Sequence, residues 1–167
     1  FGFQRVGDLA WAAGDMQARG SLLGGAVVLE RTKDDVDLLC LRERARFIEG
    51  DAFEVALGGP DDVIIASHIL QHFSERRCLE LMRRLAAALK PDGRLVIHDF
   101  VSGARPADEP FPYLFSVIML GSTREGEAHS LDTYQRLLHD AALSPPEVHQ
   151  SQGMPSHFLI TGRENHR

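Results

Sequence analysis

Several features that mark particular classes of protein are missing from this sequence. Its two cysteines, Cys40 and Cys78, form no C-x-x-C pair. Neither a disulfide framework nor a zinc ribbon is therefore expected, and both residues are predicted to be buried thiols. Basic residues form no run separate from acidic ones, and the net charge is -6. Because binding to a phosphate backbone requires a basic surface, we expect no nucleic-acid partner.

Long apolar runs are also missing. The longest, such as 63–66 and 117–120, are too short to cross a bilayer, and no signal-peptide pattern opens the chain. We therefore expect a soluble, cytoplasmic protein without a membrane partner. The G-x-G-x-x-G fingerprint is absent too, which makes a nicotinamide dehydrogenase a weak candidate.

The segments that are present alternate between strand-like and helix-like patterns over 167 residues, of which 44% are hydrophobic. This alternation predicts an α/β fold with a mostly parallel sheet, and the length suits a single domain spanning 1–167. Predicted strands lie at 26–29, 46–49, 62–67 and 94–98, with a closing hairpin at 147–150 and 157–161. Predicted helices lie at 15–22, 33–44, 74–89 and 113–120, and one more begins at Ser130.

The stretch from Arg5 to Asp15 has the pattern of a buried strand, a tight turn and the start of a helix. Proteins of the α/β class hold nucleotide-like ligands at such a turn, because small residues let the backbone approach and the helix end presents free N–H groups. Within the turn, only Gly14 is a glycine. The order of strand, turn and helix start predicts a nucleotide site at this stretch, but the residues within the turn are unusual for such a site.

Five motifs, in order, resemble the class I S-adenosylmethionine-dependent methyltransferases, and in particular the catalytic domain of the plant-type and antibiotic-tailoring O-methyltransferase family. The motifs are RVGD at 5–8, FIEGDAFE at 47–54, SHILQHFSERRC at 67–78, LKPDGRLVIHDFV at 89–101, and the tail at 130–142. The resemblance covers nearly the whole chain. It implies a Rossmann-like methyltransferase fold, with a mostly parallel seven-stranded sheet, an antiparallel last strand and helices on both faces.

The resemblance also implies S-adenosylmethionine as the cofactor. In this family an acid at the end of the second strand binds the ribose hydroxyls, and Glu30 holds that place; a carboxylate can accept hydrogen bonds from two vicinal hydroxyls. Asp51 matches the residue that borders the adenine. The alternatives are a solvated acid at Glu30 and a turn-forming Gly-Asp pair at Asp51. The implied cofactor contacts are Asp8, Ala10, Gly14, Glu30, Asp51, Ala52 and Ser67.

The first motif departs from the family pattern of an acid followed by alternating glycines. Ala10 and Ala12 stand where the family has glycine, and forcing alanine to positive φ costs roughly 1–2 kcal/mol. Trp11 adds a bulky ring, which suits a hydrophobic plug better than an adenine-stacking partner. The connections from Asp8 to Glu30 and onward are shorter than the family usually shows. Together these departures predict weakened or lost cofactor binding.

The catalytic position departs as well. In the plant-type enzymes a histidine after the fourth strand takes the proton from the substrate hydroxyl, and Gln71 stands in that place, followed by His72. Glutamine can position a substrate but cannot act as a base, whereas imidazole can. We expect both residues near the acceptor, although His72 also suits a capping or surface role. The pair His98-Asp99 ends a predicted strand and is a second candidate, with a simple strand-end turn as its alternative.

No metal site is expected. His68 and His72 are four residues apart, a spacing seen in metal sites, but no glutamate lies between them in the required pattern and no third ligand is evident.

Two functions follow from this reading. The first is S-adenosylmethionine-dependent O-methylation of a hydroxyl on a small aromatic or polyketide-like metabolite. The second is a methyltransferase-like domain that has lost cofactor binding and serves a structural or partner-binding role. The family usually carries an N-terminal helical domain that dimerises, and we expect it to be absent from this chain. Exposed apolar surface around 113–120 would then favour self-association, and a homodimer is expected in the full-length context.

Overall fold

The computed structural model of the chain describes residues 19–103, 105 and 107–164. The chain divides into two compact units, Phe1–Leu57 and Gly58–Arg167, and each is described by itself. The single domain spanning 1–167 stays a prediction. No helix in the described ranges is long and apolar enough to cross a membrane.

The first unit contains a pair of parallel strands and one α-helix. Its elements are β1 (Gly20–Gly24), α2 (Ala26–Leu38), the 3-10 helix η1 (Arg42–Arg44) and β2 (Ala45–Glu49). In the parallel pair, Gly20 lies beside Ala45 and Gly24 beside Glu49. Val36 and Leu41 form the buried centre of this unit, and the residues packed against them are Leu22, Leu39, Ala45 and Phe47.

The predicted strand at 26–29 is wrong, because this segment begins α2. Its apolar run fits a strand or a helix equally well by pattern alone. Burial explains the outcome: the buried residues of α2 are Leu29, Thr32 and Val36, which share one helix face. Residues 20–22, predicted to end a helix, instead belong to β1. Glu30 therefore lies inside a helix and not at the end of a strand.

The predicted helix at 33–44 is too long, since α2 ends at Leu38. Cys40 has a φ of 57°, and its N–H donates to the carbonyl of Asp37 while the N–H of Leu41 donates to that of Val36. This is the hydrogen-bond pattern of a Schellman cap, which stops a helix with one left-handed residue. Cys40 is exposed, contrary to the predicted buried thiol, whereas Cys78 is buried as predicted.

The second unit is built on a four-stranded sheet in the order β3-β4-β6-β5. β3 and β4 run parallel, and the last strand, β6, runs antiparallel to both of its neighbours. The antiparallel last strand implied by the family resemblance is thus present. The strands are β3 (Asp61–Ser67), β4 (Leu89–Asp99), β5 (Glu147–Gln150) and β6 (His157–Gly162).

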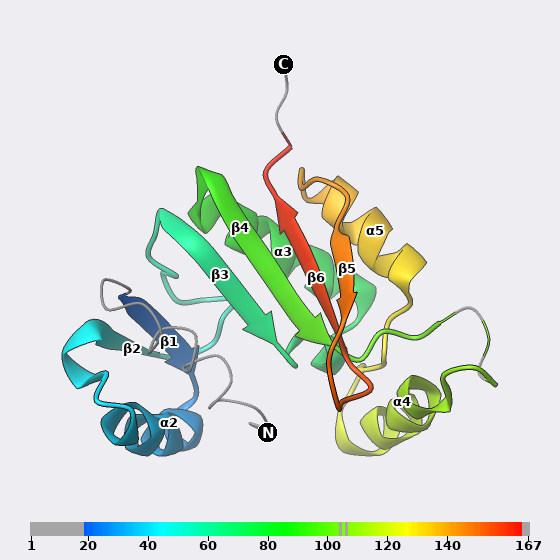
Figure 1. Ribbon diagram of the computed structural model, residues 1–167, viewed down its shortest axis with the longest axis horizontal. Coiled ribbons are helices and arrows are strands. Elements are labelled where there is room, and N and C mark those ends of the chain that lie inside the picture. Colours follow the sequence, from blue (N-terminus) through cyan, green and yellow to red (C-terminus); the bar gives the residue numbers. More distant parts are fainter. Residues whose placement is uncertain (1–18, 104, 106, 165–167) are drawn as a thin grey trace. The chain divides into compact units, whose positions relative to one another are not determined.

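Two helices, α3 (Glu75–Ala88) and α5 (Leu131–Asp140), cover one face of this sheet (Figure 1). α3 matches the predicted helix at 74–89 and buries an apolar stripe at helical spacing that includes Cys78, Leu81, Met82 and Leu85. The side chain of Ser130 caps α5 by accepting a hydrogen bond from the N–H of Thr133. A third helix, α4 (Pro110–Ser122), lies beyond the carboxyl ends of β3 and β4 (Figure 1).

Residues 90–93, between α3 and the predicted strand at 94–98, are part of β4, which begins at Leu89. The pairing of β3 with β4 shifts register between Asp61 and Val63. Gly93 permits this, because a Cβ there would lie 2.8 Å from the carbonyl oxygen of Asp61. The described residues contain six strands. The strand predicted at 5–8 lies outside them, so the seven-stranded sheet stays a prediction.

Candidate functional site

The carboxyl ends of β3 and β4 meet at one edge of the sheet in the second unit. Ser67 at the end of β3 lies beside His98 near the end of the parallel strand β4. Ligands of open α/β sheets bind outside the carboxyl ends of parallel strands. The polar residues gathered at this edge are His68, Gln71, Asp99 and Tyr134, which we call the Asp99 cluster.

Asp99 is the centre of the cluster and is fully buried. Its Oδ2 accepts hydrogen bonds from the backbone N–H of Gln71 at 3.3 Å and from the hydroxyl of Tyr134 at 3.2 Å. Its Oδ1 accepts one from the N–H of Phe100 at 2.9 Å. Burial raises the pKa of Asp99 to about 7, because the charged form loses its hydration, and the hydrogen bonds offset only part of this. The carboxyl group therefore exchanges a proton near neutral pH.

His68 lies beside Asp99, with 3.8 Å between its Nδ1 and the Oδ1 of Asp99. Its φ of 48° is in the left-handed region, which non-glycine residues rarely adopt and which recurs at functional sites. Its backbone N–H donates to the carbonyl of His98 at 2.8 Å, which fixes this conformation. Burial lowers the pKa of His68, so the ring is neutral at pH 7 and able to accept a proton.

Gln71 and His72, the predicted acceptor residues, lie in the short 3-10 helix η2 (Leu70–His72). Gln71 is only 4% exposed, and its Nε2 donates to the carbonyl of His68 at 3.4 Å. Its Oε1 is buried and receives no hydrogen bond of normal geometry from the described residues. Burial also lowers the pKa of His72. The structure thus brings Gln71 into the Asp99 cluster, with His72 next to it.

The predicted pair His98-Asp99 does not act as one group. Successive strand residues point to opposite faces, and His98 has partners of its own. Its Nε2 lies 2.9 Å from the Oγ of Ser156, its Nδ1 lies 3.5 Å from the Oγ of Ser67, and its ring stacks on Phe158 at 4.1 Å. Burial lowers the pKa of His98 to about 4. Ser67, implied as a cofactor contact, is therefore placed beside His98, and its role toward a cofactor stays a prediction.

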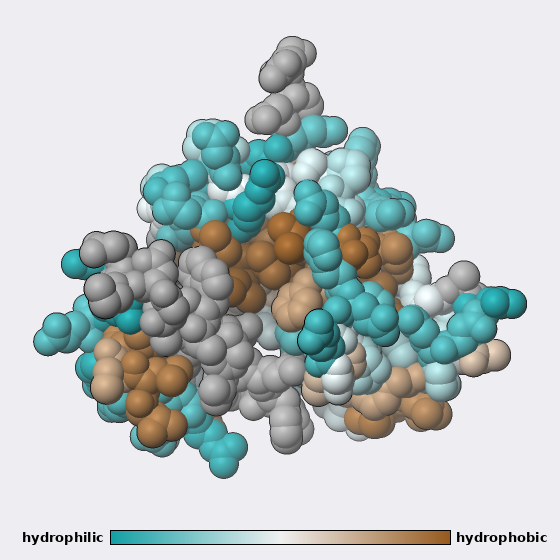
Figure 2. Space-filling model, in the orientation of Figure 1, coloured by the Kyte–Doolittle hydropathy of each residue, from teal (hydrophilic) through white to brown (hydrophobic). Residues whose placement is uncertain are grey.

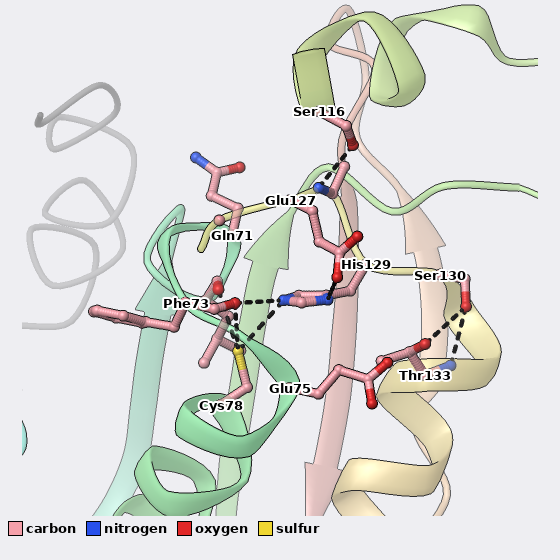
Figure 3. Close-up of polar contacts among 12 residues, drawn as sticks. Gln71, Phe73, Glu75, Cys78, Ser116, Glu127, His129, Ser130 and Thr133 are labelled. Carbon is pink, nitrogen blue, oxygen red and sulfur yellow. Dashed lines mark hydrogen bonds and ion pairs between the residues drawn. The ribbon is translucent and has the colours of Figure 1, made fainter. Parts of the chain in front are cut away.

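A second polar group, the His129 network, holds the turn that carries Gln71 (Figure 3). His129 is 2% exposed, and its Nε2 donates to the carbonyl of Phe73 at 3.0 Å and lies 3.5 Å from the Sγ of Cys78. The thiol of Cys78 in turn donates to the carbonyl of Leu70 at 3.2 Å. Burial raises the pKa of Cys78 to about 12. The thiol stays protonated at neutral pH and is a structural donor, not a nucleophile.

The loop between α4 and α5 also packs on this turn. The N–H of Gly126 donates to the Oγ1 of Thr123 at 2.8 Å. A Cβ at Gly126 would overlap the carbonyl oxygen of Gln71 and lie 3.0 Å from the Cα of His72. Only glycine allows this close approach. Nothing in the sequence singled out Gly126 or His129, because their partners are distant along the chain.

A groove of about 220 Å³ lies between the start of α4 and the β5–β6 hairpin, lined by 108–112, Gln150, Pro155 and His157. Aromatic rings connect it to the Asp99 cluster. The ring centroids of His68 and Phe100 are 4.8 Å apart, and those of Phe100 and Phe111 are 5.0 Å apart. Since Phe111 also lines the groove, a flat apolar ligand would meet aromatic surface next to the polar cluster.

In the first unit, the residues predicted to bind cofactor are placed differently. Glu30 is exposed on α2, so its predicted position at a strand end is wrong, and Gly24 ends the strand instead. Asp51 follows β2, and its Oδ1 accepts a hydrogen bond from the N–H of Phe53 at 2.9 Å, which is the turn-forming alternative. Ala52 lies in the same turn. Three further predicted residues, Asp8, Ala10 and Gly14, lie outside the described residues.

The described part of the chain holds no group of three or more metal-ligating side chains. Within that part of the chain, no third metal-ligating side chain joins His68 and His72. His68 belongs to the Asp99 cluster through its contact with the carboxylate.

Comparison with known proteins gives relatives among the O-methyltransferases. The chain is 31% identical over 111 residues to the mitomycin biosynthesis 6-O-methyltransferase of Streptomyces lavendulae, a match that covers 66% of this chain and 32% of that protein. The chain thus spans about a third of the length of this curated relative. A separate match of 25 residues is 80% identical to the pyruvate dehydrogenase E1 component of Escherichia coli and covers 15% of this chain and 3% of that protein.

Solved structures share the fold. A Nostoc punctiforme protein described as an O-methyltransferase superposes with a TM-score of 0.88 at 26% identity, over 92% of this chain and 47% of its own. The structure of PigF with S-adenosylhomocysteine has a TM-score of 0.75 at 22% identity, over 96% of this chain and 54% of PigF. Both support an α/β methyltransferase fold. The family profile of the O-methyltransferase domain matches residues 18–144. With this match over most of its length, the chain belongs to the O-methyltransferase domain family.

Proposed function

We propose that the second unit binds the hydroxyl group of a small aromatic or polyketide-like metabolite, as the acceptor half of an O-methyltransferase. The observation that carries this proposal is the Asp99 cluster, in which a buried carboxyl lies 3.8 Å from an imidazole at the carboxyl ends of two parallel strands. The mitomycin enzyme among the relatives supports the class of metabolite. Because the chain covers only part of that protein, the activity and acceptor are proposals for this one.

Gln71 positions the acceptor in this proposal. Its Oε1 is buried and open to a hydrogen bond from the acceptor hydroxyl, and its Nε2 is already held by the carbonyl of His68. An amide can orient a hydroxyl group but cannot remove its proton. His72, the neighbouring residue in η2, lies on the same turn.

His68 takes the proton. A neutral ring nitrogen accepts it from the acceptor oxygen, and the Asp99 carboxylate 3.8 Å away stabilises the imidazolium that forms. This arrangement moves the role of base three residues back from Gln71, where the family resemblance places it. The aromatic row from Phe100 to Phe111 and the groove beside it suit the ring of the acceptor.

A pair of probes tests whether the site recognises a hydroxyl group. Binding of 2-naphthol and of naphthalene is measured by saturation-transfer NMR on the intact chain, and neither probe requires a cofactor. One hydrogen bond of about 0.5–1.5 kcal/mol should make 2-naphthol bind roughly 3- to 10-fold more tightly. Gln71→Ala should abolish this preference. A matched control, His149→Ala on the exposed strand β5, should retain it. Equal affinities for the two probes in the unmodified chain would overturn the proposal.

A second candidate function is a partner-binding module without transfer activity. The observation that favours it is the apolar outer face of α4, where Leu114, Val117, Ile118 and Leu120 are between 58% and 75% exposed. Figure 2 shows apolar side chains at the surface over this helix. Exposed apolar patches on a folded chain mark interaction surfaces, and a second copy of the chain is the partner we propose.

A further inference from the structure

We infer that the described residues of the first unit do not fit S-adenosylmethionine, because the ends of the two parallel strands there lack the contacts that the cofactor half of a methyltransferase site requires. The inference rests on the proposed function for the identity of the site and deepens it. Two separate observations carry it: the end of β1 and the turn after β2.

The end of β1 carries no acid. The family resemblance requires a carboxylate at the end of this strand to hold the ribose hydroxyls, and β1 ends in Gly24, followed by Gly25. The nearest acid along the chain is Glu30, which is exposed on α2. A side chain at Gly24 would also be crowded, because its Cβ would lie 2.9 Å from a Cγ of Val28. Among the described residues, the end of β1 therefore offers no carboxylate to the ribose hydroxyls.

The turn after β2 is occupied by its own backbone. One carboxylate oxygen of Asp51 accepts the N–H of Phe53, and the carbonyl of Asp51 accepts the N–H groups of Glu54 and Val55. These bonds make Asp51 the residue that closes the turn. The turn is complete without a ligand.

Calorimetry with S-adenosylhomocysteine tests the inference on the intact chain, after circular dichroism has shown that it is folded. PigF, whose structure contains this ligand, is the positive control. PigF should bind, and the intact chain should give no saturable heat up to about 1 mM ligand, which corresponds to less than about 4 kcal/mol of binding free energy. Saturable binding with a Kd below about 1 mM would overturn the inference.

Amide hydrogen exchange gives a second readout on the same protein. Addition of S-adenosylhomocysteine should leave exchange unchanged at 19–24 and 49–55, the segments that end β1 and follow β2. Ligand-dependent protection there would also overturn the inference. The naphthol comparison keeps the two proposals apart: binding of S-adenosylhomocysteine contradicts only this inference, whereas loss of the hydroxyl preference contradicts only the proposed function.

Discussion

Replacing Asp99 with asparagine should change how the stability of the chain depends on pH. The pKa of Asp99 is raised from 3.8 to about 7 by burial. Between these values the folded chain holds a proton that the unfolded chain releases, so stability is full below the unfolded pKa and is lost as pH rises through the folded pKa. At about 1.4 kcal/mol per pH unit, the whole interval corresponds to about 4 kcal/mol. Asp99→Asn has no proton to lose and should not show this decline.

The assay is urea unfolding followed by circular dichroism at pH 5, 6, 7 and 8. Relative to the unmodified chain, Asp99→Asn should gain about 2 kcal/mol in free energy of unfolding between pH 5 and pH 7 and little more by pH 8. Asp92→Asn, on the exposed beginning of β4, is the matched control. Its difference from the unmodified chain should stay within about 0.5 kcal/mol at every pH. A constant difference for Asp99→Asn across this range would refute the reasoning about the buried carboxyl.

Two further predictions concern the His129 network and α4. His129→Ala removes the donor to the buried carbonyl of Phe73 and leaves a cavity, so we expect a loss of about 2–4 kcal/mol in urea unfolding, against about 0.5 kcal/mol or less for the exposed His139→Ala. An equal loss in both would contradict a structural role for the network. Replacing Leu114 and Val117, which are 64% and 65% exposed, with glutamate should reduce the molar mass in light scattering from dimer to monomer, whereas Ser122→Glu should not. A monomeric unmodified chain would contradict self-association through α4.

The parts of the fold that could be predicted from the sequence are those with strong local patterns. α3 has an apolar stripe at helical spacing, and Cys78, Leu81, Met82 and Leu85 within it are buried. α5 begins after a serine that caps it. The closing hairpin is bounded by turn residues and forms as β5 and β6. In each case one local signal, namely periodicity, a cap or bounding turn residues, is enough to determine the element.

Local patterns failed where two structures fit the same residues or where partners are distant. The run before Glu30 suits a strand or a helix, and only the burial of one helix face, with Leu29, Thr32 and Val36 on it, decides for α2. The Asp99 cluster joins residues 28 and 35 positions apart along the chain. His68 could be considered only as a metal ligand from its spacing, because its contact with Asp99 depends on the pairing of β3 with β4.

The close packing of Gly126 against the turn at Gln71 and His72 has a consequence for changing acceptor specificity. Any side chain at position 126 would displace the backbone of both residues. A substitution there would therefore disturb the site itself, whichever acceptor is offered. A combinatorial library aimed at new acceptors should therefore keep glycine at 126 and diversify Phe111 and Gln150, which line the groove. Tolerance to mutation should be lowest where the two loops meet and highest along the groove.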